Sequence, residues 1–279
     1  MSRTAALTTA ALFVVAACSG GGASQAASTA PATASSGTPS SAAAALTIYG
    51  AASLSGVLDK IKTAYETANP GTKLTISTDS SATLETQIEQ GAPADVFLSA
   101  DTTNPKKLVD KGLAAGAAVT FAANKLTIIV PIANPAGITT PADLAKSGVR
   151  VIAAGDAVPI TKYATQLVAN LAREPGYPAD FPARYAANIA SREDNVKAIV
   201  AKIELGEGDA GIVYVTDAKA SSEVITVDVP DTANVPATYA GVVVKASRNA
   251  DAAEAFLTWF AGPGGQAILG AFGFLPPHS

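Results

Sequence analysis

The sequence predicts an α/β fold in which two lobes, each a sheet flanked by helices, are joined by crossing strands. Over residues 46–279, short apolar runs typical of strands alternate with segments whose apolar residues recur at helical spacing. Strand–helix alternation of this kind favours parallel sheets covered by helices. The segment is long enough for two such sheets. We expect lobe 1 to comprise 46–124 plus 239–279, and lobe 2 to comprise 125–238.

The predicted strands are short runs rich in Val, Ile, Leu and Thr. Most are nearly continuous in apolar residues, as in buried strands, whereas 73–78 alternates apolar and polar residues like a half-buried strand. In chain order they cover 46–52, 73–78, 95–99, 126–131, 149–154, 211–215, 224–227 and 239–244.

The predicted helices follow from apolar stripes and from residues that begin or end a helix. The stripe from Leu54 to Tyr65 shares one helix face, and the Asn-Pro-Gly at 69–71 ends that helix. Pro141 opens a short helix, because a proline in the first turn loses no hydrogen bond. Further helices are expected at 83–90, 104–111, 160–171, 251–260 and 266–272, with one that begins within 191–195 and a short one at 216–217.

The composition excludes several classes of function. The formal net charge is −4 and 15% of residues are charged, so the basic footprint that nucleic-acid binding requires is absent. The single cysteine, Cys18, cannot form an intrachain disulfide, and the single histidine, His278, lies in the C-terminal tail. A Ser–His or Cys–His catalytic pair needs a histidine that the fold can position, and a zinc site of His and Cys is excluded by the same counts. We therefore expect neither an enzyme nor a cofactor.

Residues 1–17 have the pattern of a signal peptide. One positive charge at Arg3 precedes an uncharged, mostly apolar segment that is too short to span a bilayer. The segment ends in Val-Ala-Ala-Cys, which resembles the lipobox of bacterial lipoproteins, so we expect a lipid on Cys18. The alternative is an ordinary secretory signal with an incidental cysteine. Residues 18–45 are almost entirely Gly, Ala, Ser, Thr and Pro, which predicts a disordered linker.

Candidate ligand-binding residues lie at the turns between predicted strands and helices. In open α/β sheets, ligands bind beside the carboxyl ends of strands, where helices begin. Such turns contain Ser53, Ser80-Ser81, 158–160 and 193–196, and Tyr214 ends a further strand. Taken singly, each serine could be only a helix N-cap. Together, helix starts with free N–H groups, two hydroxyls and a phenol indicate an anion site.

The charged residues near these turns have other interpretations. Lys162 is a candidate counter-charge, but a solvated lysine on a helix face is the favoured interpretation. Asp95 and Asp101 flank a buried strand and are interpreted as turn and cap residues. Asp79 bears on ligand choice, because an acceptor in the site would favour a protonated anion such as hydrogen phosphate.

Four stretches at these turns resemble the periplasmic molybdate-binding proteins of ABC transporters, which have the type II periplasmic-binding-protein (Venus flytrap) fold. They are 51–54, 80–84, 87–101 with its Gly-Ala-Pro-Ala-Asp-Val-Phe block, and 211–218. Weaker matches lie at 155–159, 194–196 and 273–274. The resemblance spans essentially all of 46–279.

In that family, uncharged groups alone hold the oxyanion. The resemblance implies that Ser53 and Ser81 each supply a hydroxyl and a backbone N–H. It implies backbone N–H groups from Ile160 and Val196, and the phenolic O–H from Tyr214. The metal-containing ligand would be molybdate, with tungstate expected as well. The sequence departs from the family's usual small residues at 160 and 161, and Ala82 replaces a frequent serine.

The resemblance also implies the biological setting. The chain would be the binding subunit of an ABC importer, a monomer that delivers its anion to the permease and its ATPase. It would lie outside the cytoplasm, anchored to the cell membrane through Cys18. Because neither lobe alone completes the ligand contacts, binding would favour closure of the two lobes.

Three other functions stay open. The chain could carry sulfate, phosphate or another oxyanion, although a site of donors alone disfavours anions that keep a proton near neutral pH. It could be a hydrolase that uses Ser53 or Ser81, although neither has a positioned histidine or a lysine at a recognisable spacing. It could also be an adhesion or scaffold module in which the groups at the strand ends are only helix caps.

Overall fold

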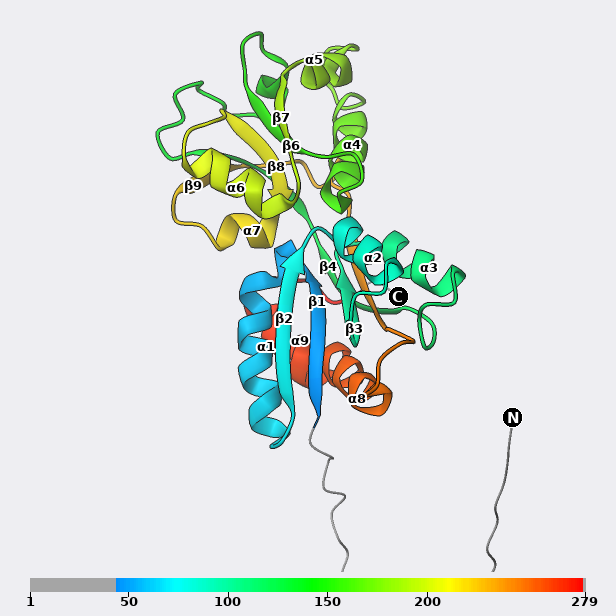
Figure 1. Ribbon diagram of the computed structural model, residues 1–279. Helices are drawn as coiled ribbons and strands as arrows, with labels where there is room; N and C mark the ends of the chain where they lie inside the picture. Colours follow the sequence, from blue (N-terminus) through cyan, green and yellow to red (C-terminus); the bar gives the residue numbers. More distant parts are fainter. Residues whose placement is uncertain (1–43, 278–279) are drawn as a thin grey trace, which may run out of the picture. The chain divides into compact units, whose positions relative to one another are not determined.

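The computed structural model describes residues 44–277; the predicted signal peptide, Cys18, nearly all of the predicted linker and His278 lie outside the described residues. The described part contains two five-stranded sheets with helices packed around them (Figure 1), which confirms the predicted α/β class. Strand β1 begins at Ala45, so the last residue of the predicted linker belongs to the fold. Between 44 and 277, no helix combines the length and the hydropathy needed to cross a bilayer.

The first sheet has the strand order β2-β1-β3-β10-β4. In it, β1 pairs in parallel with β2 and β3, whereas β10 runs antiparallel to β3 and β4. Its strands are β1 (Ala45–Ala51), β2 (Lys73–Asp79), β3 (Val96–Ser99), β4 (Val119–Asn124) and β10 (Ala237–Val243). Its helices are the 3₁₀ turn η1 (Ala52–Leu54), α1 (Ser55–Ala68), α2 (Ser81–Glu89), α3 (Thr103–Asp110), α8 (Ala250–Ala261) and α9 (Pro263–Ala271).

The second sheet has the strand order β7-β6-β8-β5-β9. Here β6 pairs in parallel with β7 and β8, whereas β5 runs antiparallel to β8 and β9. Its strands are β5 (Leu126–Pro131), β6 (Val151–Ala154), β7 (Ile189–Glu193), β8 (Ala210–Tyr214) and β9 (Val224–Val227). Its helices are the 3₁₀ segment η2 (Pro141–Ala145), α4 (Pro159–Leu171), α5 (Phe181–Ala187), α6 (Val196–Glu204) and α7 (Val215–Lys219).

Helix α1 illustrates how the apolar stripes become the core. Val57, Leu58, Ile61 and Tyr65 are all buried, as their helical spacing predicts. The Tyr65 ring packs edge-on against the Phe256 ring of α8, with the ring centroids 5.0 Å apart. The stripe therefore fixes the first helix against the C-terminal helices, which cover the same sheet.

Both sheets are mixed, so the prediction of parallel sheets is wrong. Strand–helix alternation predicts direction only for strands that a crossover helix joins. Strand β5 instead follows β4 directly through Lys125, and β10 follows β9 through 228–236, where the chain passes between the sheets. The strands at these two crossings, β5 and β10, are the antiparallel ones.

The sequence prediction misses β4, α5 and β7. Residues 191–195 were assigned to a helix start, but 189–193 form β7 and helix α6 begins at Val196, after the N-cap Asn195. Strand β7 lies at a sheet edge and alternates half-buried with exposed positions, so it lacks the apolar run that marks a strand. Strand β4 contains two adjacent alanines, which have low strand propensity, so its sequence lacks a strand signal although its last four residues are buried in the fold.

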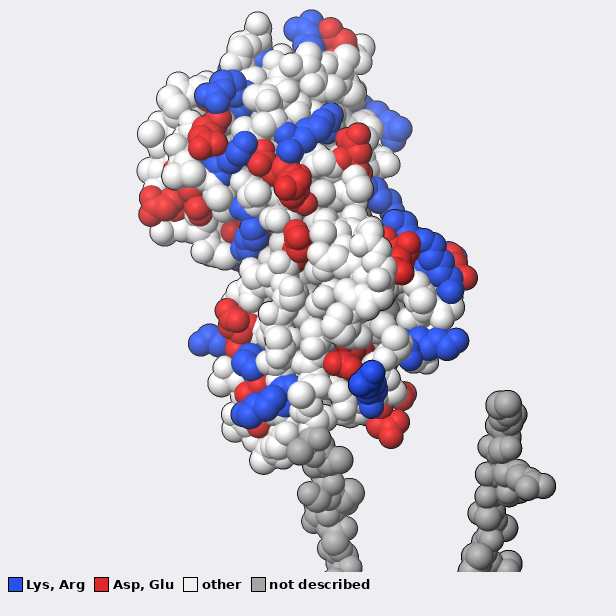
Figure 2. Space-filling model, in the orientation of Figure 1, with Lys and Arg blue, Asp and Glu red and all other residues white. Residues whose placement is uncertain are grey.

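The surface charge is mixed. On the face in Figure 2, lysine and arginine side chains are interspersed with aspartate and glutamate, without a broad area of either sign. This pattern agrees with the small net charge of −4 and provides no basic footprint for nucleic acid on that face.

Candidate ligand-binding site

A small cavity lies where strand ends of both sheets meet the first turns of helices. From the first sheet it is bordered by the turns after β1 and β2, and from the second by the starts of α4 and α6 and the end of β8. All five predicted site residues line it: Ser53, Ser81, Ile160, Val196 and Tyr214. The free space at its centre is about 10 Å³, which is room for one water-sized group, so the cavity suits a small ion rather than an organic solute.

The first turns of α2 and α6 each offer a backbone N–H at this cavity. Ser80 caps α2, with its Oγ accepting from the N–H of Thr83 at 3.2 Å, and Asn195 caps α6 in the same way through Ala198. Each cap satisfies the third N–H of its helix only. The first N–H groups, those of Ser81 and Val196, have no intrahelical acceptor. Within the described part of the chain, no hydrogen bond engages them.

Helix α4 and the turn η1 add two further donors. The first residue of α4 is Pro159, which has no N–H, so Ile160 carries the first donor of that helix. Ser53 lies in the middle of η1, the 3₁₀ turn that follows β1 without a side-chain cap. Four backbone donors from two sheets therefore surround one small space, with the positive ends of helices α2, α4 and α6 directed at it.

The hydroxyl of Ser81 is not a helix cap. Its Oγ accepts a hydrogen bond from the backbone N–H of Ala100 at 3.0 Å, and the residue is buried. A hydroxyl has one proton to donate. Because a protein donor already occupies a lone pair of the oxygen, the Ser81 proton remains for a ligand in the cavity.

Tyr239 of β10 holds the hydroxyl of Ser53. The two oxygens are 3.0 Å apart, and either could donate. Burial raises the pKa of Tyr239 well above its usual value, so the phenol keeps its proton and can donate to Ser53. In that arrangement the Ser53 proton is available to a ligand, as the Ser81 proton is.

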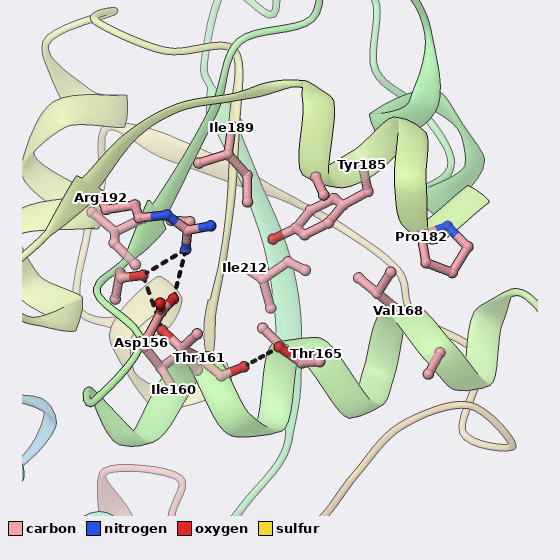
Figure 3. A pocket seen from close by; sticks show the side chains of 16 residues that line it. Asp156, Ile160, Thr161, Thr165, Val168, Pro182, Tyr185, Ile189, Arg192 and Ile212 are labelled. Carbon is pink, nitrogen blue, oxygen red and sulfur yellow. Dashed lines mark hydrogen bonds and ion pairs between the residues drawn. The ribbon is translucent and has the colours of Figure 1, made fainter. Parts of the chain in front are cut away.

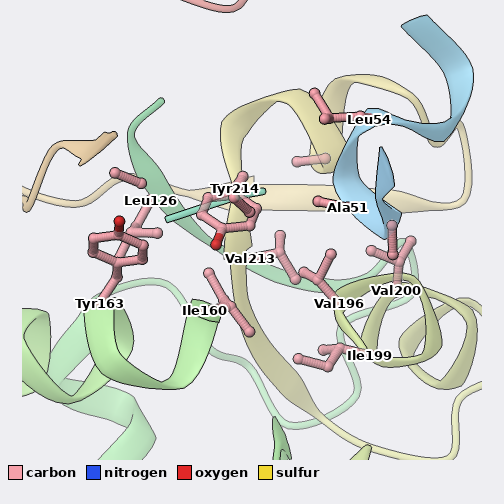
Figure 4. Packing of buried hydrophobic residues seen from close by; sticks show 14 of the residues in the cluster. Ala51, Leu54, Leu126, Ile160, Tyr163, Val196, Ile199, Val200, Val213 and Tyr214 are labelled. Atoms are coloured by element: carbon pink, nitrogen blue, oxygen red, sulfur yellow. The ribbon is translucent and has the colours of Figure 1, made fainter. Parts of the chain in front are cut away.

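The phenol of Tyr214 is the third hydroxyl at the cavity. The residue is 1% exposed, and its oxygen has no hydrogen-bond partner within residues 44–277. Burial raises the pKa of Tyr214 well above its usual value, so the phenol stays protonated. Figure 4 shows its ring beside Ile160, with Val196 and Ala51 near by. An unpaired buried hydroxyl costs free energy unless a ligand accepts its hydrogen bond.

The charged residues considered from the sequence do not line the cavity. Lys162 directs its Nζ to the Oγ1 of Thr103 at 3.3 Å. Asp79 Oδ1 accepts from the N–H of Ser80 at 2.7 Å and from the Nδ2 of Asn195 at 3.3 Å. Asp79 Oδ1 thus contacts a turn of its own sheet and the cap of α6, and Asp79 does not line the cavity.

Asp101 acts at a helix start, as the sequence predicts, whereas Asp95 accepts hydrogen bonds from distant segments instead of capping a local turn. Asp95 Oδ2 accepts from the N–H of Thr47 at 2.7 Å, and Asp101 Oδ1 accepts from the N–H of Asn104 at 3.0 Å, in the first turn of α3. Among residues 44–277, no cluster of three His, Cys, Asp or Glu side chains could bind a metal cation. The cavity is therefore lined by uncharged groups that mainly donate.

Two residues that shape the site escape sequence reasoning. Asn195 directly precedes the apolar stripe of α6, and this N-cap signal could have located the helix start. No pattern in the sequence near Tyr239 indicates its role, because its contact with Ser53 joins residues 186 positions apart.

The fold and the cavity together define a solute-binding protein. A ligand would be enclosed by groups that can bind an anion, and among residues 44–277 neither serine hydroxyl is hydrogen-bonded to a basic side chain or a carboxylate. The chain belongs to the bacterial extracellular solute-binding proteins, whose family model matches residues 46–275. This membership confirms the predictions of an extracytoplasmic binding protein and of a chain that is not an enzyme.

Individual proteins of known name resemble the chain over most of its length. The chain is 31% identical to the molybdate-binding protein ModA of Mycobacterium tuberculosis over 89% of its own length and 90% of the relative's. It is 32% identical to ModA of Haemophilus influenzae, over 82% and 89%. The solved periplasmic molybdate-binding protein of Azotobacter vinelandii superposes with a TM-score of 0.70 at 26% identity, covering 84% of this chain and all of that one. These similarities confirm the predicted family resemblance and the type II periplasmic-binding fold.

Proposed function

We propose that the cavity binds one molybdate ion, and tungstate as well. The hydroxyls of Ser53, Ser81 and Tyr214 would donate to the oxyanion, together with the N–H groups of Ser53, Ser81, Ile160 and Val196. The observation that carries the proposal is the phenol of Tyr214, which is buried without a partner in residues 44–277 at a cavity whose other polar groups are mainly donors. The molybdate-binding relatives support the choice of ligand.

The binding energy is sufficient without a counter-charge. A hydrogen bond to a charged group contributes roughly 1.5–3 kcal/mol, and a helix N-terminus adds roughly 0.3–2 kcal/mol. Several such donors can exceed the roughly 8–12 kcal/mol of a micromolar-to-nanomolar complex after the cost of ordering the site.

A site whose polar groups donate hydrogen bonds and do not accept them favours a fully deprotonated anion. Hydrogen phosphate carries an O–H near neutral pH, and this group would need an acceptor in the cavity. The carboxylate of Asp79 does not line the cavity, and its Oδ1 accepts from Ser80 and Asn195. Molybdate, tungstate and sulfate need donors only, and the molybdate-binding relatives support molybdate over sulfate.

Ligand binding would couple the two lobes, 46–124 plus 239–279 and 125–238. Ser53 and Ser81 follow strands of the first sheet, whereas Ile160, Val196 and Tyr214 belong to the second. An anion that contacts both sets stabilises the arrangement in which the lobes approach each other. In this form the protein, as a monomer, would dock on the permease of an ABC importer and release the anion for transport driven by its ATPase.

The N-terminal sequence would tie this binding protein to the membrane. Its only cysteine, Cys18, stands directly after Val-Ala-Ala at the end of an apolar segment with the signal-peptide pattern. Lipidation at Cys18 would keep the ligand-binding domain outside the cytoplasm and close to the permease.

Isothermal titration calorimetry with the domain 44–279 tests the ligand. Molybdate, tungstate, sulfate and phosphate are titrated separately at one pH and ionic strength. We expect molybdate and tungstate to bind at least about tenfold more tightly than sulfate, and phosphate to bind weakest, because each such step needs only about 1.4 kcal/mol. Tighter binding of sulfate than of molybdate would overturn the choice of ligand, and no binding of any oxyanion would overturn the site.

A further inference from the structure

A second and much larger cavity lies between α4, α5 and β7 of the second sheet (Figure 3). It has about 240 Å³ of free space, enough for an organic molecule of several heavy atoms. Aliphatic side chains form most of its wall, among them Val168, Ile189 and Ile212. It shares only the side chain of Ile160 with the small cavity described above.

The hydroxyl of Tyr185 is the first group that indicates a binding site in this cavity. The residue lies on α5 and is 8% exposed, and in Figure 3 its oxygen is directed into the cavity. Within residues 44–277, no hydrogen bond engages this hydroxyl. Burial raises the pKa of Tyr185 to about 12, so the phenol remains a donor at neutral pH. Because this oxygen is not among the fully buried polar atoms without a partner, water can reach it, and an acceptor on a ligand in the cavity would take the place of that water.

Arg192 of β7 brings a positive charge to the same space. Its Nη1 lies 3.1 Å from Asp156 Oδ1, but the Asp156 side chain is 89% exposed, so solvent weakens this pair. A guanidinium has five N–H donors, and most of them remain for a ligand. Figure 3 shows the guanidinium and the Tyr185 hydroxyl facing the same part of the cavity.

The other hydroxyls at this cavity are already satisfied. Thr161 donates to the backbone oxygen of Gly155 at 2.8 Å, and Thr165 donates to that of Thr161 at 2.8 Å. Apart from the carboxylate of Asp156, which is 89% exposed and pairs with Arg192, the polar side chains left for a ligand are two donors, one of them charged, beside an apolar wall. This combination selects against cations and against ligands that are polar throughout.

We infer that this cavity binds a small organic monocarboxylate with an apolar body. The carboxylate would accept from the Arg192 guanidinium, whose planar fork matches its geometry, and from the Tyr185 hydroxyl. The apolar body would lie against Val168 and Ile212 and lose its contact with water there. Nothing in this inference depends on the oxyanion site.

Hexanoate is a suitable probe, with hexan-1-ol as its neutral counterpart. We expect calorimetry or ligand-observed NMR to detect hexanoate binding to the domain 44–279. Replacing the cation while keeping an aliphatic stem, in Arg192→Met, should weaken hexanoate about tenfold, the effect of losing a charge-assisted contact. Hexan-1-ol should change less than about twofold, because its apolar contacts are kept. The matched control is Arg173→Met, an exposed arginine that does not line the cavity.

A second variant tests the location. Ala164 of α4 lines the cavity, and Ala164→Leu places a larger side chain in it, so hexanoate binding should be lost. If this variant fails to fold, Tyr185→Phe provides the test, with an expected loss of about threefold. The inference is overturned if hexanoate does not bind the wild type, or if Arg192→Met and Arg173→Met behave alike. It is equally overturned if the folded Ala164→Leu variant, or Tyr185→Phe in its place, binds hexanoate like the wild type.

Discussion

The Oγ of Ser53 and the phenolic oxygen of Tyr239 lie 3.0 Å apart, across 186 positions of sequence. The contact joins a hydroxyl at the small cavity to a buried phenol that keeps its proton, and where this phenol donates to the serine oxygen, the serine proton is left for a ligand. The N–H of Ala100 does the same for Ser81. Both serines are thus prepared to donate rather than accept, which is what a fully deprotonated oxyanion requires.

Tyr239→Phe should weaken molybdate binding by about 0.5–1.5 kcal/mol, the contribution of one ordinary hydrogen bond, although Tyr239 does not line the cavity. This loss of affinity should depend on the presence of the Ser53 hydroxyl. In a Ser53→Ala background, the same substitution should therefore change the affinity by less than about 0.3 kcal/mol. Calorimetry of the four proteins in this double-mutant cycle measures the coupling, and additive losses would show that Tyr239 acts by another route.

Tyr214→Phe should have opposite effects on binding and on stability. Loss of a donor to a charged ligand should weaken molybdate by about 1–3 kcal/mol. The ligand-free protein should keep its melting temperature or gain, because the substitution removes a buried hydroxyl that has no partner in the described residues. Calorimetry and thermal unfolding check the two effects. Tyr177→Phe, a partly buried tyrosine outside the cavity, is the matched control, and a Tyr214→Phe variant with wild-type affinity would contradict the site.

The adjacent serines 80 and 81 should separate ligand binding from helix capping. Ser81→Ala removes a hydroxyl whose proton is available to the ligand, so molybdate should bind about 1–3 kcal/mol more weakly. Ser80→Ala removes the N-cap of α2, so the protein should lose about 1 kcal/mol of stability while its affinity changes less than about threefold. Denaturant unfolding and calorimetry on both variants measure the contrast, and the reverse pattern would show that the two roles are exchanged.

Asp217 should make the stability fall as the pH rises. Burial raises its pKa from 3.8 to about 6, although Lys197 Nζ lies 3.2 Å from its Oδ1. Between these values the folded protein binds more protons than the unfolded chain, so the free energy of unfolding decreases with increasing pH. Asp217→Asn cannot titrate. Its stability relative to the wild type should therefore increase between about pH 4 and pH 7, by an amount on the order of 2–3 kcal/mol.

Denaturant unfolding of both proteins at several pH values isolates this effect. The difference between the two unfolding free energies removes the contribution of all other titrating groups. A difference that does not change with pH would mean that Asp217 titrates alike in the folded and unfolded chains.

Cys18→Ala should release the protein from the membrane. If Cys18 carries the lipid, the substituted full-length chain should move from the membrane fraction to the soluble fraction of cells that express it, because the anchor depends on the acyl chains. The purified Cys18→Ala protein should bind molybdate as before, since Cys18 is not among the proposed ligand-binding residues. A Cys18→Ala protein that stays with the membrane would contradict the lipid anchor.

Much of the fold follows from local sequence. The stripe from Leu54 to Tyr65 determines α1, and the continuous apolar run at 126–131 determines β5. The turns at Ser53, Ser81 and 158–160 can be located as candidate anion contacts because each lies where an apolar strand gives way to a helical pattern. These signals depend on neighbours within a few residues, which is the range over which periodicity and capping operate.

The tertiary structure alone decides what these turns do together. Strand directions at the crossings, the edge strand β7 and the Ser53–Tyr239 contact depend on segments far apart in the chain, which local periodicity does not relate. Which serine caps α2 and which keeps a free proton depends on the position of Ala100 N–H, contributed after β3. The sequence by itself therefore determined the fold class and predicted the candidate residues of the site. Tertiary contacts around the first sheet decided the hydrogen-bond partner of each serine hydroxyl, because such partners are set by position in space.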